Sequence, residues 1–316
     1  MLKTLVLSFG LLFISSAQTL AAQTSHDTPS ALISPAQLQK QLQHPQLRIL
    51  DIRSPDAYAQ GHITGAVNTP YGKYRGPADN AGALRTEAEL SELFSQAGIS
   101  PDSYVVVSYE GANPTDFGAA ARVYWTLKAG GLQQLSILDG GIQAWLAADG
   151  QLDQHPTPIT PTQFSYQYNP SMLINTADLA QAIEQGNAPV LIDARPEPFF
   201  KGQQRVDAAA RYGTLPGARD LDFNAFFNTD APTLKSAAEL TALVQKAGLN
   251  HAPTVSFCNT GHWAATNWFV LSELVGNPDV KLYPESIVEW SKTDRPMDNQ
   301  PSRFQALKLD AQRAIK

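Results

Sequence analysis

Residues 255–264 read VSFCNTGHWA, and they contain the only cysteine of the chain. Val255–Phe257 reads as a short strand of a parallel sheet, like the apolar, β-branched run at 105–107, and residues 264–274 favour a helix. Cys258 therefore stands in the loop that joins a strand to a helix. Because ligands bind at the carboxyl ends of strands in parallel α/β sheets, this stretch predicts both an α/β fold and a site at Cys258.

The loop after Cys258 favours a thiolate over a thiol. Its backbone N–H groups and the start of the next helix bring partial positive charge to the sulfur, and Gly261 permits the positive φ of a tight turn. A buried, unreactive cysteine is the alternative, since cysteine is among the most buried residue types. The position between strand and helix favours the reactive thiol.

The same pattern occurs twice along the chain. Blocks of sequence between residues 50 and 145 match blocks between residues 192 and 290 in the same order, for example 89–99 with 239–249. Repetition of this kind indicates a duplicated domain. We expect two domains, at 30–150 and 171–300, each with a central, mainly parallel sheet flanked by helices. A proline-rich, extended linker is expected at 151–170.

The first copy has no cysteine at the matching place. Residues 109–117, which follow the strand at 104–108, read YEGANPTDF. We expect this segment to be a loop about five residues longer than its counterpart, followed by a helix at 119–127. The first domain is then without a nucleophile, and its loop is expected to help to shape a cleft between the domains.

Composition excludes several classes of protein. The chain has 316 residues, 43% of them hydrophobic and 16% charged, with a net charge of −6. This apolar content excludes disorder as the main state, and the negative charge argues against a nucleic-acid partner. A single cysteine permits neither an intramolecular disulfide nor a four-cysteine zinc site. We expect no cofactor and no bound metal.

The N-terminal segment reads as a signal peptide at 1–22. Lys3 precedes a short apolar run at 5–14, and small residues follow near Ala21 and Ala22. The alternative is an N-terminal anchor helix, but the run is short for a bilayer. We therefore expect a soluble periplasmic or secreted protein without a membrane anchor.

Several motifs together resemble one family. Residues 51–58 (DIRSPDAY) and 61–68 (GHITGAVN) resemble the opening of a rhodanese domain, 138–145 (LDGGIQAW) resembles its closing motif, and 258–264 (CNTGHWA) is similar to its active-site loop. The resemblance covers most of the chain after the signal peptide. It implies a tandem-domain sulfurtransferase, with a persulfide on Cys258 and a catalytically silent N-terminal half.

The resemblance also implies roles for the loop. Cys258 would take sulfur from thiosulfate, 3-mercaptopyruvate or a similar small donor and pass it to a thiol, to cyanide or to a protein acceptor, with ping-pong kinetics. Thr260 could donate a hydrogen bond to the sulfur. His262 could be a proton donor, a partial cation or a packed side chain, and Trp263 a packing wall. The predicted active-site loop comprises Asn259, Thr260, Gly261, His262, Trp263 and Ala264.

An anionic donor requires positive charge, and this loop contains no Lys or Arg. Phe199 stands where relatives have a substrate-binding arginine. The segment 195–219 carries an excess of basic residues, and we predict that Arg205 and Arg211 bind the donor. Lys73 and Arg75 of the first domain are the next candidates. A solvated surface role is the alternative for each of them.

Two other functions compete with sulfur transfer. A cysteine phosphatase or arsenate reductase of related fold needs the pattern Cys-x5-Arg, with the arginine holding the oxyanion, and Ala264 stands at that arginine's position. A sulfur-carrier or binding protein, which would hold the persulfide without rapid turnover, remains open. A comparison of catalytic turnover with the single loading of one sulfur onto Cys258 distinguishes a carrier from an enzyme.

Overall fold

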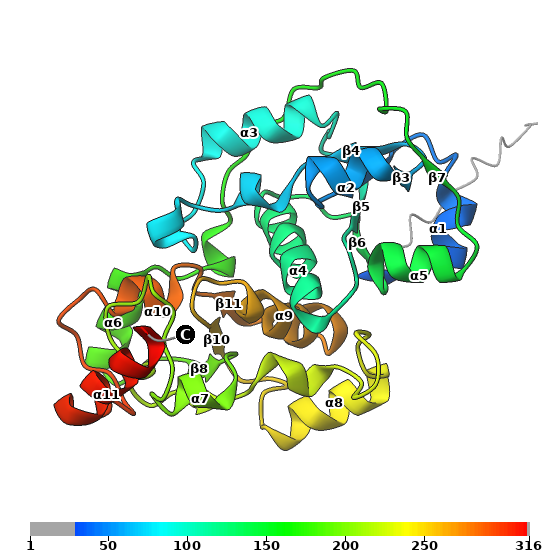
Figure 1. Cartoon of the computed structure of the whole chain (residues 1–316). Coiled ribbons are helices and arrows are strands. Elements are labelled where there is room, and N and C mark those ends of the chain that lie inside the picture. Colours follow the sequence, from blue (N-terminus) through cyan, green and yellow to red (C-terminus); the bar gives the residue numbers. More distant parts are fainter. Residues whose placement is uncertain (1–28, 315–316) are drawn as a thin grey trace, which may run out of the picture.

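The computed structural model describes residues 29–314. The predicted signal peptide at 1–22 lies outside the described residues. Figure 1 shows two lobes in chain order, each with a sheet between helices. Among residues 29–314, no helix combines the length and the apolar character that a bilayer crossing requires.

The N-terminal lobe contains a five-stranded sheet in which every neighbouring pair is parallel. Its strands, in spatial order, are β1 (Leu32–Ile33), β6 (Leu135–Leu138), β5 (Tyr104–Ser108), β2 (Leu47–Asp51) and β4 (Ala66–Asn68). A short antiparallel pair, β3 (His62–Ile63) with β7 (Leu152–Asp153), lies apart from it. The helices are α1 (Pro35–Gln41), α2 (Pro55–Gln60), α3 (Glu87–Gln96), α4 (Pro114–Ala129) and α5 (Gly141–Ala147), with the 3₁₀ turns η1 (Tyr71–Tyr74) and η2 (Ala78–Asn80).

The C-terminal lobe repeats this plan with a four-stranded parallel sheet. Its strands are β11 (Val280–Leu282), β10 (Thr254–Phe257), β8 (Val190–Asp193) and β9 (Arg219–Asp220). The helical elements are η3 (Pro170–Met172), α6 (Thr176–Glu184), α7 (Glu197–Phe200), η4 (Phe223–Phe226), α8 (Ala237–Lys246), α9 (Trp263–Phe269), the π-helical turn η5 (Val270–Leu274), α10 (Ser286–Trp290) and α11 (Arg303–Ala314). The predicted fold class, two α/β domains with parallel sheets flanked by helices, is confirmed.

The duplication extends to individual ion pairs. At the end of β2, Arg53 lies 2.6 Å from Asp51, and at the end of β8, Arg195 lies 2.6 Å from Asp193. In both places the aspartate also accepts the backbone N–H of its arginine at 3.0 Å. These carboxylates hold the chain as it leaves the sheet.

One expectation about the first domain was wrong. Helix α4 begins at Pro114 rather than at residue 119, so the connection that follows β5 is no longer than the one that follows β10. Asn113 caps α4 by accepting the backbone N–H of Asp116 at 3.1 Å, and Pro114 fits the first helical position because it has no N–H to satisfy. This cap and the first turn of α4 make up the segment that was expected to be loop.

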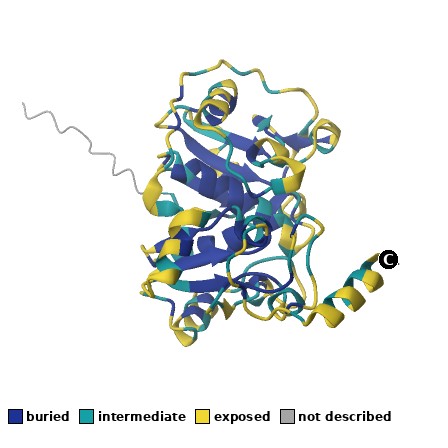
Figure 2. Ribbon diagram, turned by 90° about the vertical axis from the view of Figure 1, so that its left-hand side faces the viewer, coloured by how far each residue is buried: buried dark blue, intermediate teal, exposed yellow. Residues whose placement is uncertain are grey.

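The two domains meet along α4 and α9, which lie side by side at the centre of Figure 1. Aromatic side chains fill this contact: the ring of Phe269 lies 5.5 Å from Phe117 and 5.0 Å from Tyr124. Buried residues run through both lobes and across their junction (Figure 2). The domains therefore share one apolar core, and its burial favours their association.

Residues 154–169 contain no helix or strand. This segment nevertheless packs against the first domain beside α3. The backbone N–H of Thr162 donates to the carbonyl of Ser95, and the N–H of Tyr166 donates to the Ser91 hydroxyl, both at 2.9 Å. Phe164 and Tyr166 are buried. The connection between the domains is therefore held in place along part of its length.

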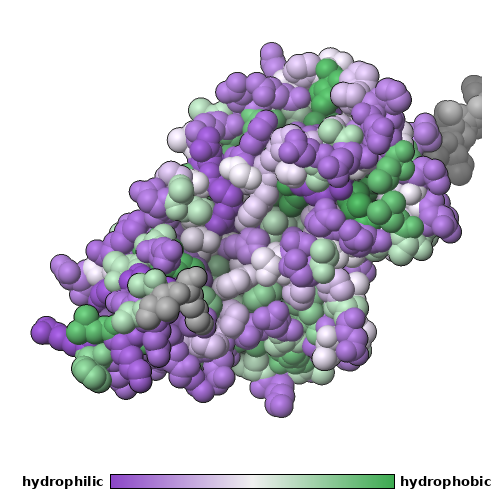
Figure 3. All heavy atoms as spheres, viewed as in Figure 1, coloured by the Kyte–Doolittle hydropathy of each residue, from purple (hydrophilic) through white to green (hydrophobic). Residues whose placement is uncertain are grey.

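The surface is mostly polar, with scattered apolar residues (Figure 3). The clearest exposed apolar side chains are on α11, where Phe304 is 80% and Leu307 is 70% exposed. The opposite side of this helix faces the loop 201–213, and Arg205 and Tyr212 of that loop both bond to Asp310.

Candidate active site

Cys258 directly follows β10 and is only 1% exposed. Its backbone N–H donates to the Ser286 hydroxyl at 3.0 Å, and that hydroxyl donates to the carbonyl of Tyr283 at 2.7 Å. The carbonyl of Cys258 accepts the N–H of Ile287 at 3.1 Å. Ser286 thus anchors the start of the loop, a role that no pattern in the sequence indicated.

A cavity of about 390 Å³ opens beside Cys258, between the domains. It is lined by two residues of the N-terminal domain and by residues of two segments of the C-terminal domain. These are Arg75 and Thr115, then Val206 and Ala208, and finally Cys258, Asn259, Thr260, His262 and Trp263. The predicted loop and the first domain thus meet at one site.

The loop that follows Cys258 presents free backbone donors. In the described part of the chain, no protein acceptor takes a hydrogen bond from the N–H groups of residues 259–262. Gly261 adopts φ +68°, which is a left-handed conformation. A Cβ there would lie 2.4 Å from Nη1 of Arg122 and 2.6 Å from the carbonyl oxygen of Pro284, so only glycine fits. Uncommitted N–H groups of this kind can bind an anion.

Arg122 of α4 places a buried cation behind this loop. It is 1% exposed, and its Nη1 donates to the carbonyl of Gly261 at 3.3 Å. Burial, together with the charge of Arg75, lowers the pKa of Arg122 to about 10, so the guanidinium is still charged at neutral pH. Sequence reasoning missed this residue. The available signal was a single arginine inside the apolar segment 119–127.

Arg75, just after η1, reaches the loop from the other side. Its Nη2 donates to Oγ1 of Thr260 at 2.8 Å, and its guanidinium lies 5.3 Å from the centre of the Tyr71 ring. Lys73, named with it in the sequence analysis, is exposed and lines a different groove with Glu89 and Glu92.

His262 bonds to the N-terminal domain through both ring nitrogens. Nε2 lies 2.9 Å from the carbonyl oxygen of Thr115, and Nδ1 lies 2.9 Å from the Tyr71 hydroxyl. A carbonyl can only accept, so Nε2 carries the hydrogen and Nδ1 accepts from Tyr71. Burial, together with the charge of Arg75, lowers the pKa of His262 to about 3. The structure thus places a neutral His262 in the domain contact.

Trp263 is a wall of the cavity. Its ring stacks on Phe223 at 5.1 Å with an interplanar angle of 6°, and Phe199 meets its edge at 6.1 Å. Its indole N–H donates to the Thr115 hydroxyl at 3.3 Å. Ala264 is buried in the first turn of α9, where its carbonyl accepts the Ser256 hydroxyl at 2.9 Å.

The side chain of Asn259, the loop residue next to Cys258, contacts the buried ion pair at the end of β8. Its Oδ1 accepts from Nη1 of Arg195 at 3.4 Å. The same arginine forms the ion pair with Asp193. Asn259 therefore ties the loop to the neighbouring strand.

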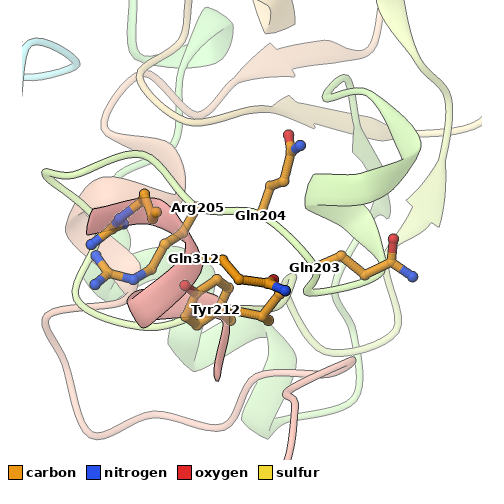
Figure 4. Close-up of a pocket in the computed structure, with 7 residues that line it drawn as sticks. Gln203, Gln204, Arg205, Tyr212 and Gln312 are labelled. Carbon is orange, nitrogen blue, oxygen red and sulfur yellow. The ribbon is translucent and has the colours of Figure 1, made fainter. Parts of the chain in front are cut away.

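The structure does not bring Arg205 or Arg211 into this cavity. Arg205 pairs with Asp310 at 3.0 Å and donates to the carbonyl of Ala209 at 2.7 Å. Figure 4 shows it with Tyr212 and Gln312 where the loop 201–213 meets α11. Arg211 donates to backbone carbonyls of residues 291–295. Both guanidinium groups are committed elsewhere, and donor binding by them stays a prediction without a contact to support it.

The comparison with known families agrees with this geometry. The rhodanese-like domain family matches residues 34–148 and again residues 175–293. The chain belongs to the rhodanese family. It is a sulfurtransferase with two rhodanese domains, of which the second carries the cysteine.

Its relatives carry names from the same chemistry. It is 29% identical over 282 residues to a putative thiosulfate sulfurtransferase of Synechococcus elongatus, covering 86% of each chain. It is 28% identical over 275 residues to the sulfur carrier protein TtuD of Thermus thermophilus, covering 83% of this chain and 94% of the relative.

A third relative has a solved structure. The rhodanese chain is 27% identical over 278 residues to the 3-mercaptopyruvate sulfurtransferase of Escherichia coli, covering 83% of this chain and 95% of that protein. The crystal structure of the Escherichia coli enzyme superimposes with a TM-score of 0.67 at 25% identity, covering 81% of this chain and 98% of that one.

Proposed function

We propose that this rhodanese moves sulfane sulfur from a small anionic donor, such as thiosulfate, to a thiol or cyanide through a persulfide on Cys258. The observation that carries the proposal is the position of Cys258 on a cavity of about 390 Å³, beside a loop whose N–H groups are uncommitted. A persulfide and its anionic donor both need such donors.

In the first half-reaction, the Cys258 thiolate attacks the outer sulfur of thiosulfate. A new S–S bond forms to Cys258, the S–S bond of thiosulfate breaks, and sulfite leaves with that bond's electron pair. The negative charge now lies on the outer sulfur of the persulfide. The uncommitted N–H groups of the loop next to Cys258 are the donors that we expect to stabilise this charge during the transfer.

In the second half-reaction, the acceptor attacks the outer persulfide sulfur. With cyanide, a C–S bond forms, the persulfide S–S bond breaks, and thiocyanate leaves while the Cys258 thiolate is restored. Two half-reactions through one covalent intermediate give ping-pong kinetics. Thr260 supports this chemistry: because its oxygen accepts from Arg75, its own O–H is available to donate to sulfur.

A sulfur carrier is the second candidate, favoured by the name of the Thermus thermophilus relative and by a loop without Lys or Arg. Steady-state turnover separates the two. An enzyme forms many equivalents of thiocyanate per chain from thiosulfate or 3-mercaptopyruvate with cyanide, whereas a carrier is loaded once and turns over slowly. Turnover no faster than the uncatalysed reaction would contradict the proposed enzyme.

We also propose export to the periplasm or the medium, on the sequence of residues 1–22 alone. Mass spectrometry of the protein recovered from fractionated cells tests it. Export predicts a mature N-terminus near residue 22 or 23 in the periplasmic or extracellular fraction, and an uncleaved chain in the cytosol contradicts it.

A further inference from the structure

We propose that Arg75, in the domain without the catalytic cysteine, binds the anionic end of the sulfur donor and so sets donor specificity. The inference rests on the proposed function. Arg75 and Cys258 line the same cavity although they belong to different domains. The guanidinium is fixed there by its 2.8 Å bond to Oγ1 of Thr260, two residues after the cysteine.

Arg75 is the charged group of this cavity. Of the side chains that line it in the described part of the chain, Arg75 alone carries a positive charge at neutral pH, since His262 is neutral. Arg205 and Arg211, the cations predicted from the sequence, bond elsewhere. A donor that needs a cation near Cys258 finds it in Arg75.

The guanidinium of Arg75 has bonding capacity left. Within residues 29–314 it forms no ion pair, and its Nη1 is buried without a hydrogen-bond partner. A buried, charged N–H group without a partner is costly, so binding an acceptor there is favourable. Sulfonate and carboxylate oxygens are the acceptors that match a guanidinium best.

A second cation strengthens the argument for an anionic ligand. Arg122 lies behind Gly261, and its Nε is also buried without a partner. The charge of Arg75 lowers the pKa of Arg122, so the two cations are close enough to repel each other. An anion in the cavity relieves this repulsion. Arg122 belongs to the positioning of the loop, while Arg75 is the residue that meets the donor.

The experiment compares an anionic donor with an uncharged one. Wild type, Arg75→Ala, Arg75→Lys and the neighbouring control Lys73→Ala are assayed with thiosulfate and with a dialkyl trisulfide at fixed cyanide. We expect Arg75→Ala to raise the thiosulfate KM by about ten- to a hundredfold, as loss of a hydrogen bond to a charged group does. For the trisulfide, which has no anionic end, the loss in kcat/KM should be at least about fivefold smaller than the loss for thiosulfate. Arg75→Lys should be intermediate and Lys73→Ala unchanged.

The outcomes distinguish a failure of the Arg75 inference from a failure of the proposed function. If wild type turns over thiosulfate and Arg75→Ala keeps its KM within about twofold, Arg75 does not bind the donor. An equal loss of kcat/KM with both donors also overturns the inference, because it indicates a general effect through Thr260. If wild type turns over neither donor, the proposed function fails and this inference fails with it.

Discussion

The Tyr71 hydroxyl of the first domain donates to Nδ1 of His262 in the second, at 2.9 Å. With the bond from Nε2 to the Thr115 carbonyl, it holds a neutral imidazole in the domain contact beside the Cys258 cavity. In the neutral ring these bonds fix one tautomer: Nε2 carries the hydrogen because the Thr115 carbonyl can only accept, and Nδ1 accepts from Tyr71.

This contact makes stability depend on pH. The pKa of His262 is about 3 in the folded protein, below its ordinary value near 6.5. His262 therefore lowers the free energy of unfolding as the pH falls from 6.5 toward 3, by up to about 1.4 kcal/mol per pH unit, and it has no such effect above pH 6.5. Denaturant unfolding at pH 7 and pH 5 should show wild type losing up to about 2 kcal/mol more than His262→Gln.

His251, an exposed histidine, is the control. His251→Gln should keep the wild-type difference between pH 7 and pH 5. An equal pH dependence in wild type and His262→Gln would contradict a neutral His262 in the domain contact.

A substitution of Gly261 tests the tight loop. Gly261→Ala adds both strain at φ +68° and a clash with Arg122 and Pro284. We expect sulfur transfer to fall at least tenfold, and stability to fall by more than the roughly 1–3 kcal/mol of strain alone. Gly217→Ala separates the two effects, since Gly217 has φ +70° with open space around it. Equal effects of both variants on stability and activity would show that the loop is not closely packed.

The sequence predicted what is encoded locally. The strand 255–257, the helix after it and the cysteine between them are adjacent in the chain, so periodicity and position sufficed to predict the parallel α/β fold. The start of α4 is also encoded locally, by the cap Asn113 and by Pro114, although we expected a loop through residue 117. Contacts between side chains that lie far apart in the sequence could not be predicted from such local patterns.

The cations illustrate the limit. Composition near residue 205 shows positive charge, but not that Arg205 is paired with Asp310 and Arg211 with the carbonyls of residues 291–295. Arg75 reaches Thr260 across 185 positions of sequence. Only the docking of two domains decides which guanidinium faces the cysteine, and periodicity within one segment carries no information on that docking.

The shared core predicts that the second domain depends on the first. A fragment from residue 170 onward exposes the face of α9 that carries Trp268 and Phe269, which are fully buried in the whole chain. An exposed apolar surface of this kind promotes aggregation. We expect the fragment to be poorly soluble and at least tenfold less active per chain. A soluble, fully active fragment would contradict the shared cleft.

The contact of α11 with the loop 201–213 predicts a milder effect. Asp310 accepts from Arg205 at 3.0 Å and from Tyr212 at 2.8 Å, and Val206 and Ala208 of that loop line the cavity. Asp310→Asn should release α11 to faster proteolysis and raise the donor KM severalfold. Because the ion pair is partly exposed, global stability should change by less than about 1 kcal/mol. Unchanged proteolysis and KM would show that the loop holds its place without α11.

Intact-mass spectrometry after exposure to thiosulfate tests the central claim most directly. Wild type should gain the mass of one sulfur atom, located on the Cys258 peptide, and lose it again when cyanide is added. Cys258→Ser should gain nothing and transfer no sulfur, while its unfolding curve stays close to that of wild type. A wild-type protein that forms thiocyanate without ever carrying the extra sulfur, or a Cys258→Ser variant that keeps the activity, would contradict the persulfide account.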